Sequence, residues 1–497
     1  MSNNPDTLPI ARSRPPTVAI IGAGAAGLAA AKHLLAEGCD VLLFEHKVGP
    51  GGVWNIDPAN RLDSPVYADL ETNVPRALMT FSDHPWPPNT SLFPKSPRVQ
   101  EYLQSYLTTL ESSERARTHL HVMFNAEVID IRKVTHQKTP QWKVVVRQRH
   151  FNQPPNDVPY MVKTVVVAMG NYHHKFIPEA MGDQLAQWDA TYPGSLIHSI
   201  QYRRAEDFTG QTVLVVGNSA SGWDISANLA PTARMVIVSS QRYNPLNPAL
   251  SAPTLIGVPA IAYLDVPSRA VAFTDGRKAY NIDRIIYCTG YAYDFSFIKK
   301  GTAKGDERVF ASGVKVSNVY EHMFYTEDPT LAFVGLPTMS AAFNVAEAQS
   351  AVVARVFSGR LPLPSRSRLR SAEQSALEVW EQQMQAGEAG AGDYHSFRLT
   401  TDKDYINRLL MWAMSTRNRT VLGDHGQSPP FWCRCLDHAR DQSRAVRVVF
   451  KGKGAERHRF TSFRSLGFEL VTACEKGGNV VSMYQGRCRS CFMEPAK

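Results

Sequence analysis

The sequence predicts an α/β fold with two dinucleotide-binding (Rossmann-like) domains, a compact second domain being inserted in a larger first one. Two segments carry this prediction: TVAIIGAGAAGLAAA at 17–31 and VLVVGNSASGWDIS at 213–226. Each is an apolar, β-branched run that ends in a glycine-containing turn and continues as a helix-like stretch. Two further apolar runs, 164–170 and 284–290, also end in glycine. We expect the chain to cross between the domains at these two glycines.

The composition is that of an ordinary globular protein. The chain has 497 residues, of which 43% are hydrophobic and 20% charged, enough for two or more domains. The segment MSNNPDTLPIARSRPP has no apolar core of a signal peptide, and no apolar run approaches the ~18 residues of a membrane span. We therefore expect a cytoplasmic protein without a transmembrane anchor.

The charge and the cysteines concentrate near the end of the sequence. The net charge is +9, and most of the excess lies in residues 431–497. The rest of the chain shows no basic stripe with aromatic context, so we expect no nucleic-acid binding. Five of the seven cysteines also lie there, at spacings that match no standard zinc module, and we expect no metal. These are Cys433, Cys435, Cys474, Cys488 and Cys491.

The first glycine motif, residues 22–27, is named here the first cradle. Gly22 permits a tight turn, Gly24 allows the backbone to approach a pyrophosphate, and Gly27 allows the helix to pack on the strand. Glu45 ends the next apolar run, where an acid accepts hydrogen bonds from a ribose diol. Trp54 follows a glycine pair and offers a flat wall to a flavin ring. The predicted FAD-binding residues of this region are Gly22, Ala23, Gly24, Ala25, Ala26, Gly27, Glu45, Gly52, Val53 and Trp54.

The second glycine motif, residues 217–222, is named here the second cradle. It keeps the first and last glycines of the pattern but has Ser219 where the first cradle has Gly24. At the position of Glu45 it has Ser240, followed by Arg242, a combination that suits the 2′-phosphate of NADP(H). One cofactor would then deliver hydride and the other accept it. The predicted NADP-binding residues are Gly217, Ser219, Ser221, Gly222, Asp224, Ser240 and Arg242.

These motifs predict a division of the chain. A flexible N-terminus spans 1–16, and the FAD-binding domain spans 17–195 and resumes at 286–425. The NADP-binding domain spans 196–285. Residues 426–497 form a basic, cysteine-containing tail that we expect to be poorly ordered or atypical.

Several segments in the same order resemble the flavin-containing monooxygenases. YPGSLIHSIQY, at 192–202, is similar to the family signature F-x-G-x-x-x-H-x-x-x-(F/Y), with tyrosine in place of the phenylalanine. YADLETNVPRALMTFSDHPWP, at 67–87, resembles the segment with the family's active-site asparagine, which falls on Asn73; Thr72 beside it would contact FAD. The segment 331–365 is similar to the one that returns to the flavin, and Gln349 corresponds to a flavin-contacting glutamine. The resemblance runs from about residue 17 to about 365.

The resemblance implies a class B flavoprotein monooxygenase. NADPH would reduce FAD, and reduced flavin and O2 would form a C4a-hydroperoxide that transfers one oxygen to an amine or a sulfur of a small metabolite. Asn73 would act at this site as the catalytic residue, whereas His198 is expected to be structural. The sequence assigns neither the substrate nor the oligomeric state.

Three alternatives remain. The Baeyer–Villiger relatives, which oxygenate ketones, have tryptophan where this chain has Tyr202. A disulfide reductase shares the two-domain fold but needs a redox cysteine pair near the flavin. The third is a non-catalytic nucleotide-binding relative, which the serine in the second cradle keeps open.

Overall fold

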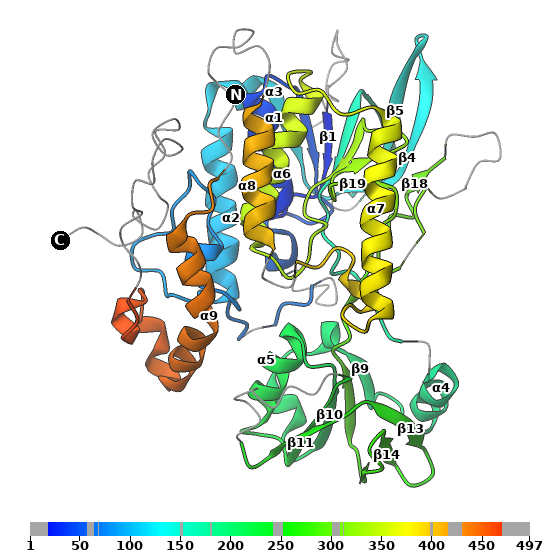
Figure 1. The fold of residues 1–497 in the computed structure, drawn as a ribbon, viewed down its shortest axis with the longest axis vertical. Helices are drawn as coiled ribbons and strands as arrows, with labels where there is room; N and C mark the ends of the chain where they lie inside the picture. The colour runs from blue at the N-terminus through cyan, green and yellow to red at the C-terminus, as the bar shows by residue number, and fades with distance from the viewer. Residues whose placement is uncertain are drawn as a thin grey trace.

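A computed structural model gives the fold (Figure 1). It describes residues 18–56, 64–67, 69–149, 153–178, 181–241, 252–300, 309–311, 313–397, 401–415 and 430–469. The mixed α/β architecture confirms the predicted fold class. Two mainly parallel sheets lie one above the other in Figure 1, and each carries one of the two glycine cradles.

The first sheet has seven strands among the described residues, in the order β19-β20-β21-β7-β1-β2-β3. From β21 to β3 the strands are parallel, and β1 and β7 are buried along their whole length. A strand covered on both faces needs apolar side chains at every position, which explains the continuous runs VAII and TVVV. The strands are β1 (Val18–Ile21), β2 (Val41–Phe44), β3 (Leu120–Met123), β7 (Thr164–Val167), β19 (Val319–Tyr320), β20 (Phe324–Tyr325) and β21 (Leu331–Phe333).

The second sheet is parallel, with the order β12-β11-β10-β16-β9 among the described residues. In both sheets the strand before the cradle lies between the next strand of the chain and a much later one: β1 between β2 and β7, and β10 between β11 and β16. This is the switch point at which open α/β sheets bind ligands. The strands are β9 (Leu196–His198), β10 (Thr212–Val216), β11 (Met235–Ser239), β12 (Leu255–Val258) and β16 (Arg284–Tyr287).

Smaller sheets accompany the two main sheets. The part of the chain built around the first main sheet is called here the first unit, and the part built around the second main sheet the second unit. One joins β18 (Ile298–Lys299), β4 (Ala126–His136), β5 (Thr139–Gln148) and β6 (Asn156–Val162); one joins β13 (Ile261–Asp265), β14 (Ala270–Phe273) and β15 (Lys278–Ala279); and one pairs β17 (Tyr291–Ala292) with β8 (His174–Lys175).

Helix α6 packs against both α1 and α8 in the first unit (Figure 1). The helices are α1 (Ala25–Ala36), α2 (Ser96–Glu111), α3 (Glu114–His119), α4 (Gly182–Thr191), α5 (Ala220–Leu229), α6 (Ala342–Phe357), α7 (Arg366–Gln385), α8 (Asp402–Met414) and α9 (Arg434–Gly452), with short 3₁₀ turns that include η1 (Gly52–Trp54), η3 (Arg76–Leu78) and η9 (Gly454–Arg459).

Helix α4 packs differently from the prediction. The expected boundary at residue 195 assigns this helix to the first domain. Its buried Leu185 and Trp188 instead share a core with Leu214 and Ile285 of the second sheet. The amphipathic pattern of a helix predicts that one face is buried but not which sheet covers it.

The region beyond residue 426 also differs from the expected tail over its described part. Helix α9 buries Leu436, Ala439, Val446 and Phe450 in the core that surrounds α1 and α6. These apolar positions recur at helical spacing on one face. The many charged residues between them obscured this periodicity in the sequence.

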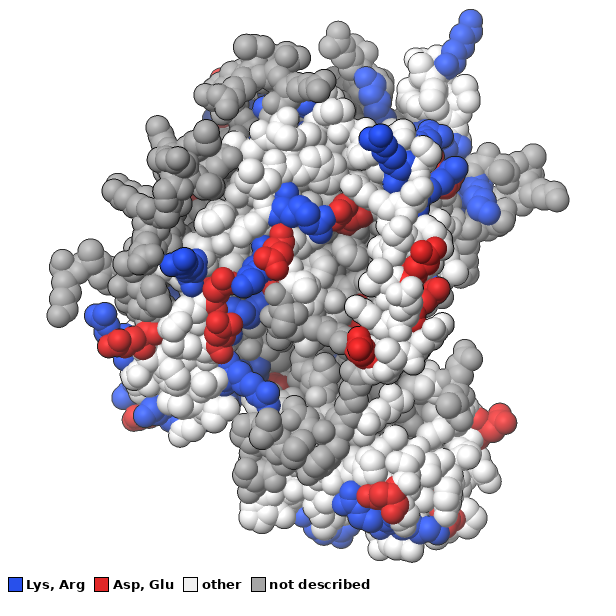
Figure 2. Space-filling view, viewed as in Figure 1, with Lys and Arg blue, Asp and Glu red and all other residues white. Residues whose placement is uncertain are grey.

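Acidic and basic side chains are interspersed on the face shown in Figure 2, including the surface over α8 and α9. Within the described ranges, no helix combines the length and the apolarity that crossing a membrane requires.

Candidate functional site: two glycine cradles

The two cradles have the same backbone hydrogen bonds. In the first, the Gly22 N–H donates to Phe44 O at 2.7 Å; in the second, the Gly217 N–H donates to Ser239 O at 2.8 Å. The residues that follow β7 and β16 also make equivalent hydrogen bonds. The Ala168 N–H donates to Ile21 O, and the Cys288 N–H donates to Val216 O. The turns therefore leave equivalent points of two equivalent sheets.

Glycine is required at the first position of each cradle. Gly22 has φ of +98° and Gly217 has φ of +104°, a region that side chains rarely adopt. A Cβ on Gly22 would lie 2.8 Å from Ala168 O, and a Cβ on Gly217 would lie 2.5 Å from Cys288 O. Both contacts are with backbone, which cannot rotate away.

The sixth position is still more restricted. A Cβ on Gly27 would lie 1.8 Å from Gly22 O, and a Cβ on Gly222 would lie 1.9 Å from Gly217 O. The helix therefore packs directly on the turn that precedes it, as the sequence predicts.

The third position explains why serine is tolerated in the second cradle. Gly24 and Ser219 are the N-cap residues of α1 and α5, with φ of −75° and −90°. Both values are ordinary for any residue. A Cβ on Gly24 would lie 3.5 Å from the Gly52 Cα, a normal contact, and the Ser219 side chain is exposed. Serine is therefore compatible with this turn.

The Gly51–Trp54 turn lines the first cradle, and its backbone approaches closely. The Gly51 N–H donates to Ala23 O at 2.9 Å. A Cβ on Gly52, which has φ of +55°, would lie 3.1 Å from Gly24 Cα, a tight contact with backbone. Lys47 Nζ donates to Gly52 O at 3.0 Å and fixes the turn. Val53 and Trp54 are half-buried in it.

Glu45 follows β2 and is 2% exposed. Its carboxylate accepts hydrogen bonds from the Ala23 N–H at 2.7 Å and the Lys47 N–H at 3.0 Å, and His46 Nδ1 lies 2.9 Å away. Burial acts to raise the pKa of Glu45, but these hydrogen bonds and the nearby His46 outweigh it, so the pKa lies below its ordinary value. A carboxylate has roughly four lone pairs, so acceptor capacity remains for a ribose hydroxyl.

The first cradle thus fits a dinucleotide such as FAD. The start of α1 has no acidic side chain that would repel a pyrophosphate, and its N–H groups and dipole favour an anion. Ala25 and Ala26 are the first residues of the helix and add no bulk there.

The segment after the Gly51–Trp54 turn carries Thr72 and Asn73. Ser64 Oγ donates to Val53 O and ties this segment to the turn. The Thr72 side chain is 1% exposed, and its Oγ1 has no hydrogen-bond partner among the described residues. The Asn73 side chain is exposed. A buried hydroxyl without a partner is costly, so Thr72 has an unused polar group for a ligand.

Gln349 is fully buried, and its side chain is hydrogen-bonded to other parts of the protein. Its Oε1 accepts from the Gly335 N–H at 2.8 Å, and its Nε2 donates to Tyr405 Oη at 2.9 Å. Gly335 in turn lies against the first cradle, since its Cβ would be 3.1 Å from the Ala26 Cβ. The side-chain amide is therefore engaged within the protein, and Gln349 holds the Gly335 turn beside α1. The expected direct contact with the flavin does not follow from this geometry.

At the second cradle, three serines at the end of β11 and at the start of α5 differ in burial. Ser239 Oγ donates to Pro259 O at 2.8 Å and is buried. Ser240 is half-buried, and its N–H donates to Val258 O at 3.2 Å. Ser221 is half-buried at the start of α5. Arg242, predicted to bind the 2′-phosphate, lies outside the described residues.

Both carboxylate oxygens of Asp224 are hydrogen-bonded within the protein. One carboxylate oxygen accepts from Arg447 Nη2 at 2.9 Å, and the other accepts from Tyr67 Oη. Tyr67 and Arg447 come from distant parts of the chain. Sequence reasoning missed both, because no local spacing relates them to the glycine motif.

His198 is held by backbone groups at both ring nitrogens. Its Nδ1 accepts from the Ile200 N–H at 3.3 Å, and its Nε2 lies 3.0 Å from Gly290 O. The neutral Nε2–H tautomer satisfies both contacts. Burial lowers the pKa of His198 to about 4, which favours the same neutral form. His198, the last residue of β9, therefore connects this strand to Gly290, which follows β16.

Comparison with known proteins agrees with this site. A family model described as flavin-binding monooxygenase-like matches residues 16–247 and 246–409. The thiol-specific monooxygenase of Saccharomyces cerevisiae is 32% identical over 358 residues, which cover 70% of this chain and 78% of that protein. The flavin-containing monooxygenase ustF2 of Aspergillus flavus is 26% identical over 505 residues, covering 86% of this chain and 98% of that protein.

Among solved structures, the S-allyl-L-cysteine S-oxygenase from Allium sativum is similar to this chain with a TM-score of 0.70 and 25% identity. The similarity covers 91% of this chain and 97% of that one. The chain therefore belongs to the flavin-binding monooxygenase-like family and is a flavin-dependent oxygenase.

Proposed function

We propose that this oxygenase binds FAD at the first cradle and NADPH at the second, and inserts one oxygen atom of O2 into the sulfur of a small metabolite. The observation that carries the proposal is the difference between the two cradles at the residue after the second strand. Glu45 stands there in the first and Ser240 in the second, on otherwise matching backbones. A carboxylate would repel a 2′-phosphate, whereas a serine hydroxyl would donate to it.

Sulfur is preferred to nitrogen because of the relatives. A thiol-specific monooxygenase and an S-allyl-L-cysteine S-oxygenase stand among the similar proteins. One name specifies thiols and the other specifies S-oxygenation. An amine nitrogen also carries a nucleophilic lone pair and is the alternative atom.

Bound FAD would supply the electron transfer and the activation of O2. The chain's own residues would hold and shield the reacting groups. Glu45 would orient the ribose, and Thr72 Oγ1 would donate to or accept from the cofactor. The amide of Asn73 both donates and accepts, so it would orient the transferred oxygen and the substrate.

The test follows oxygen into the product. FAD-loaded protein would be mixed with NADPH, ¹⁸O₂ and, in turn, a small thiol, a thioether, a tertiary amine and a cyclic ketone. We expect one labelled oxygen in the sulfoxide formed from the thioether, with NADPH consumed in equal amount. The sulfenic acid formed from the thiol condenses with a second thiol to a disulfide and releases the label as water. An ester formed from the ketone, with no sulfur product, would contradict the proposal, as would NADH oxidised as fast as NADPH.

A variant tests the assigned residue. Asn73→Ala should lower product formation by about a hundredfold and release hydrogen peroxide instead, while NADPH oxidation continues. Asn156→Ala, at the exposed start of strand β6, is the matched control and should behave as wild type. Equal product from both variants would remove Asn73 from the mechanism.

A further inference from the structure

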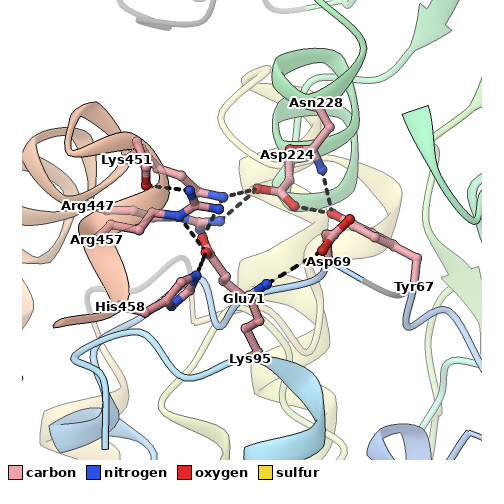
Figure 3. A network of polar contacts seen from close by, with 11 residues as sticks. Tyr67, Asp69, Glu71, Lys95, Asp224, Asn228, Arg447, Lys451, Arg457 and His458 are labelled. Atoms are coloured by element: carbon pink, nitrogen blue, oxygen red, sulfur yellow. Dashed lines mark hydrogen bonds and ion pairs between the residues drawn. The ribbon is translucent and has the colours of Figure 1, made fainter. Parts of the chain in front are cut away.

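A cluster of ion pairs around two buried carboxylates connects three distant parts of the chain (Figure 3). Helix α9 and the turn η9 supply the cations Arg447, Lys451 and Arg457. The carboxylates come from Glu71, which lies two residues before Asn73, and from Asp224, which lies on α5 two residues after the second cradle.

Glu71 is held by the C-terminal segment. Its side chain is fully buried, and Arg457 Nε donates to Oε1 at 2.6 Å. Lys451 Nζ lies 2.7 Å from Oε2, and His458 Nε2 lies 3.0 Å from Oε1. Burial acts to raise the pKa of Glu71, but the two cations Lys451 and Arg457 outweigh it and keep the pKa below its ordinary value.

Asp224 is held by the same helix. Arg447 Nη2 donates to its Oδ1 at 2.9 Å, and the Arg447 guanidinium lies 4.8 Å from the ring centre of Trp223 on α5. Lys451 Nζ lies 3.7 Å from the same oxygen. Lys451 is therefore within ion-pair distance of both carboxylates, one from each unit.

The helix that supplies these cations is fixed to the first unit. Phe450 packs on Phe93 with ring centres 4.9 Å apart. Phe460 O accepts from the Leu92 N–H at 2.9 Å, and Arg76 Nη2 donates to Thr461 O at 3.1 Å. From this anchored position α9 reaches the second unit through Arg447 and Lys451.

The cluster is not suited to bind an external anion, because each cation already faces a buried carboxylate. Its consequence is mechanical. Removing one partner of a buried ion pair leaves an uncompensated charge and is strongly unfavourable. These contacts therefore hold α5 and the Glu71–Asn73 segment in one relative position.

We infer that Arg447 and Lys451 are positioning residues for flavin reduction: they set α5, and with it the second cradle, relative to the segment that carries Asn73. The inference rests on the proposed function, in which hydride passes between cofactors held on separate sheets. A displacement of about 1 Å between reacting groups can cost as much as a hundredfold in rate.

Hydrogen–deuterium exchange of the FAD-loaded protein tests the mechanical part. In Arg447→Met and Lys451→Met, amides of α5 and of residues 64–73 should exchange about tenfold faster than in wild type. Amides of α1 and α6 should be unchanged. Arg444→Met, on an exposed part of α9, is the matched control. Unchanged exchange in α5 would overturn the inference.

Anaerobic reduction by NADPH tests the functional part. The limiting rate of flavin reduction should fall about tenfold in both variants, while the NADPH concentration at half-maximal rate and the FAD content stay within about twofold. Lys451→Arg should restore most of the rate, since it keeps the charge. A purely structural role would lower FAD content instead.

The two failures are distinguishable. A wild-type protein that NADPH does not reduce would refute the proposed function, while the exchange of α5 would still decide whether α9 orders it. Wild-type rates in both variants would overturn the inference and leave the proposed function standing.

Discussion

The two cradles are built on one plan and differ in their side chains. Both require glycine at the first and sixth places, where a Cβ would meet backbone oxygen within 1.8–2.8 Å. They differ at the third place, Gly24 against Ser219, and after the second strand, Glu45 against Ser240. The fixed places are those where an added Cβ would collide with backbone. The two other places tolerate a side chain, the exposed Ser219 and the buried Glu45, and we propose that they set which cofactor binds.

The largest effect is expected at the sixth position. Gly27→Ala should weaken FAD binding by about a hundredfold or more, because its Cβ would collide with Gly22 O. Gly222→Ala should keep FAD and lose NADPH. The flavin-to-protein absorbance ratio measures the FAD content, and titration with NADP⁺ measures binding at the second cradle. Gly182→Ala, where a Cβ meets nothing within 4 Å, is the control. A fully flavinated Gly27→Ala protein would break the comparison.

The next effect concerns the choice of cofactor. Ser240→Glu gives the second cradle the acid of the first and should lower kcat/KM for NADPH about a hundredfold, with a smaller change for NADH. Steady-state oxidation of both cofactors is the measurement. Ser240→Ala removes the hydroxyl without adding charge and should lie between wild type and Ser240→Glu. Unchanged preference in Ser240→Glu would mean that the cofactor is selected elsewhere.

Glu45→Gln should give a moderate, pH-dependent effect. Loss of charge-assisted hydrogen bonds from Ala23 and Lys47 should destabilise the protein by about 1–3 kcal/mol at neutral pH. The native pKa of Glu45 lies below its ordinary 4.5. Its contribution is therefore present above that value and lost as pH falls through the native pKa. Urea unfolding of both proteins should show a constant gap above about pH 5.5 that narrows below pH 4.5. A gap that widens on acidification would contradict this assignment.

The smallest effect is expected from Gly24→Ser. The backbone there is ordinary and the added Cβ makes a normal contact with Gly52. FAD affinity should change by only about threefold, as measured by fluorescence titration of the apoprotein. Flavin loss comparable to that of Gly27→Ala would show that the third position carries a constraint on the bound cofactor that the protein backbone does not reveal.

Much of the fold could be predicted from local sequence. Continuous apolar runs predicted the buried parallel strands β1, β7 and β10, and the glycine spacing predicted the turns. The structure confirms the α/β fold with these elements. The assignment of α4 and the folded part of the C-terminal region could not be predicted, because a helical pattern does not identify its partner.

The candidate site divides in the same way. Gly27 packs on the turn before it, as its motif implies, and Glu45 at the end of the adjoining strand accepts from the Ala23 N–H of the first cradle. Gln349 and Asp224 are different, because their polar groups are taken by Gly335 and by Arg447. A motif identifies the residue type, but distant segments decide which way its side chain is used. The binding roles assigned to these residues remain predictions.

The sequence by itself determined the family, the two glycine turns and the residues after the second strands, because each depends on spacings of a few residues and on backbone sterics. Only the tertiary structure decided that α9 packs in the core of the first unit and that Lys451 lies between Glu71 and Asp224. These groups are about 150 to 380 residues apart, and their pairing follows from the packing of whole helices rather than from any local preference.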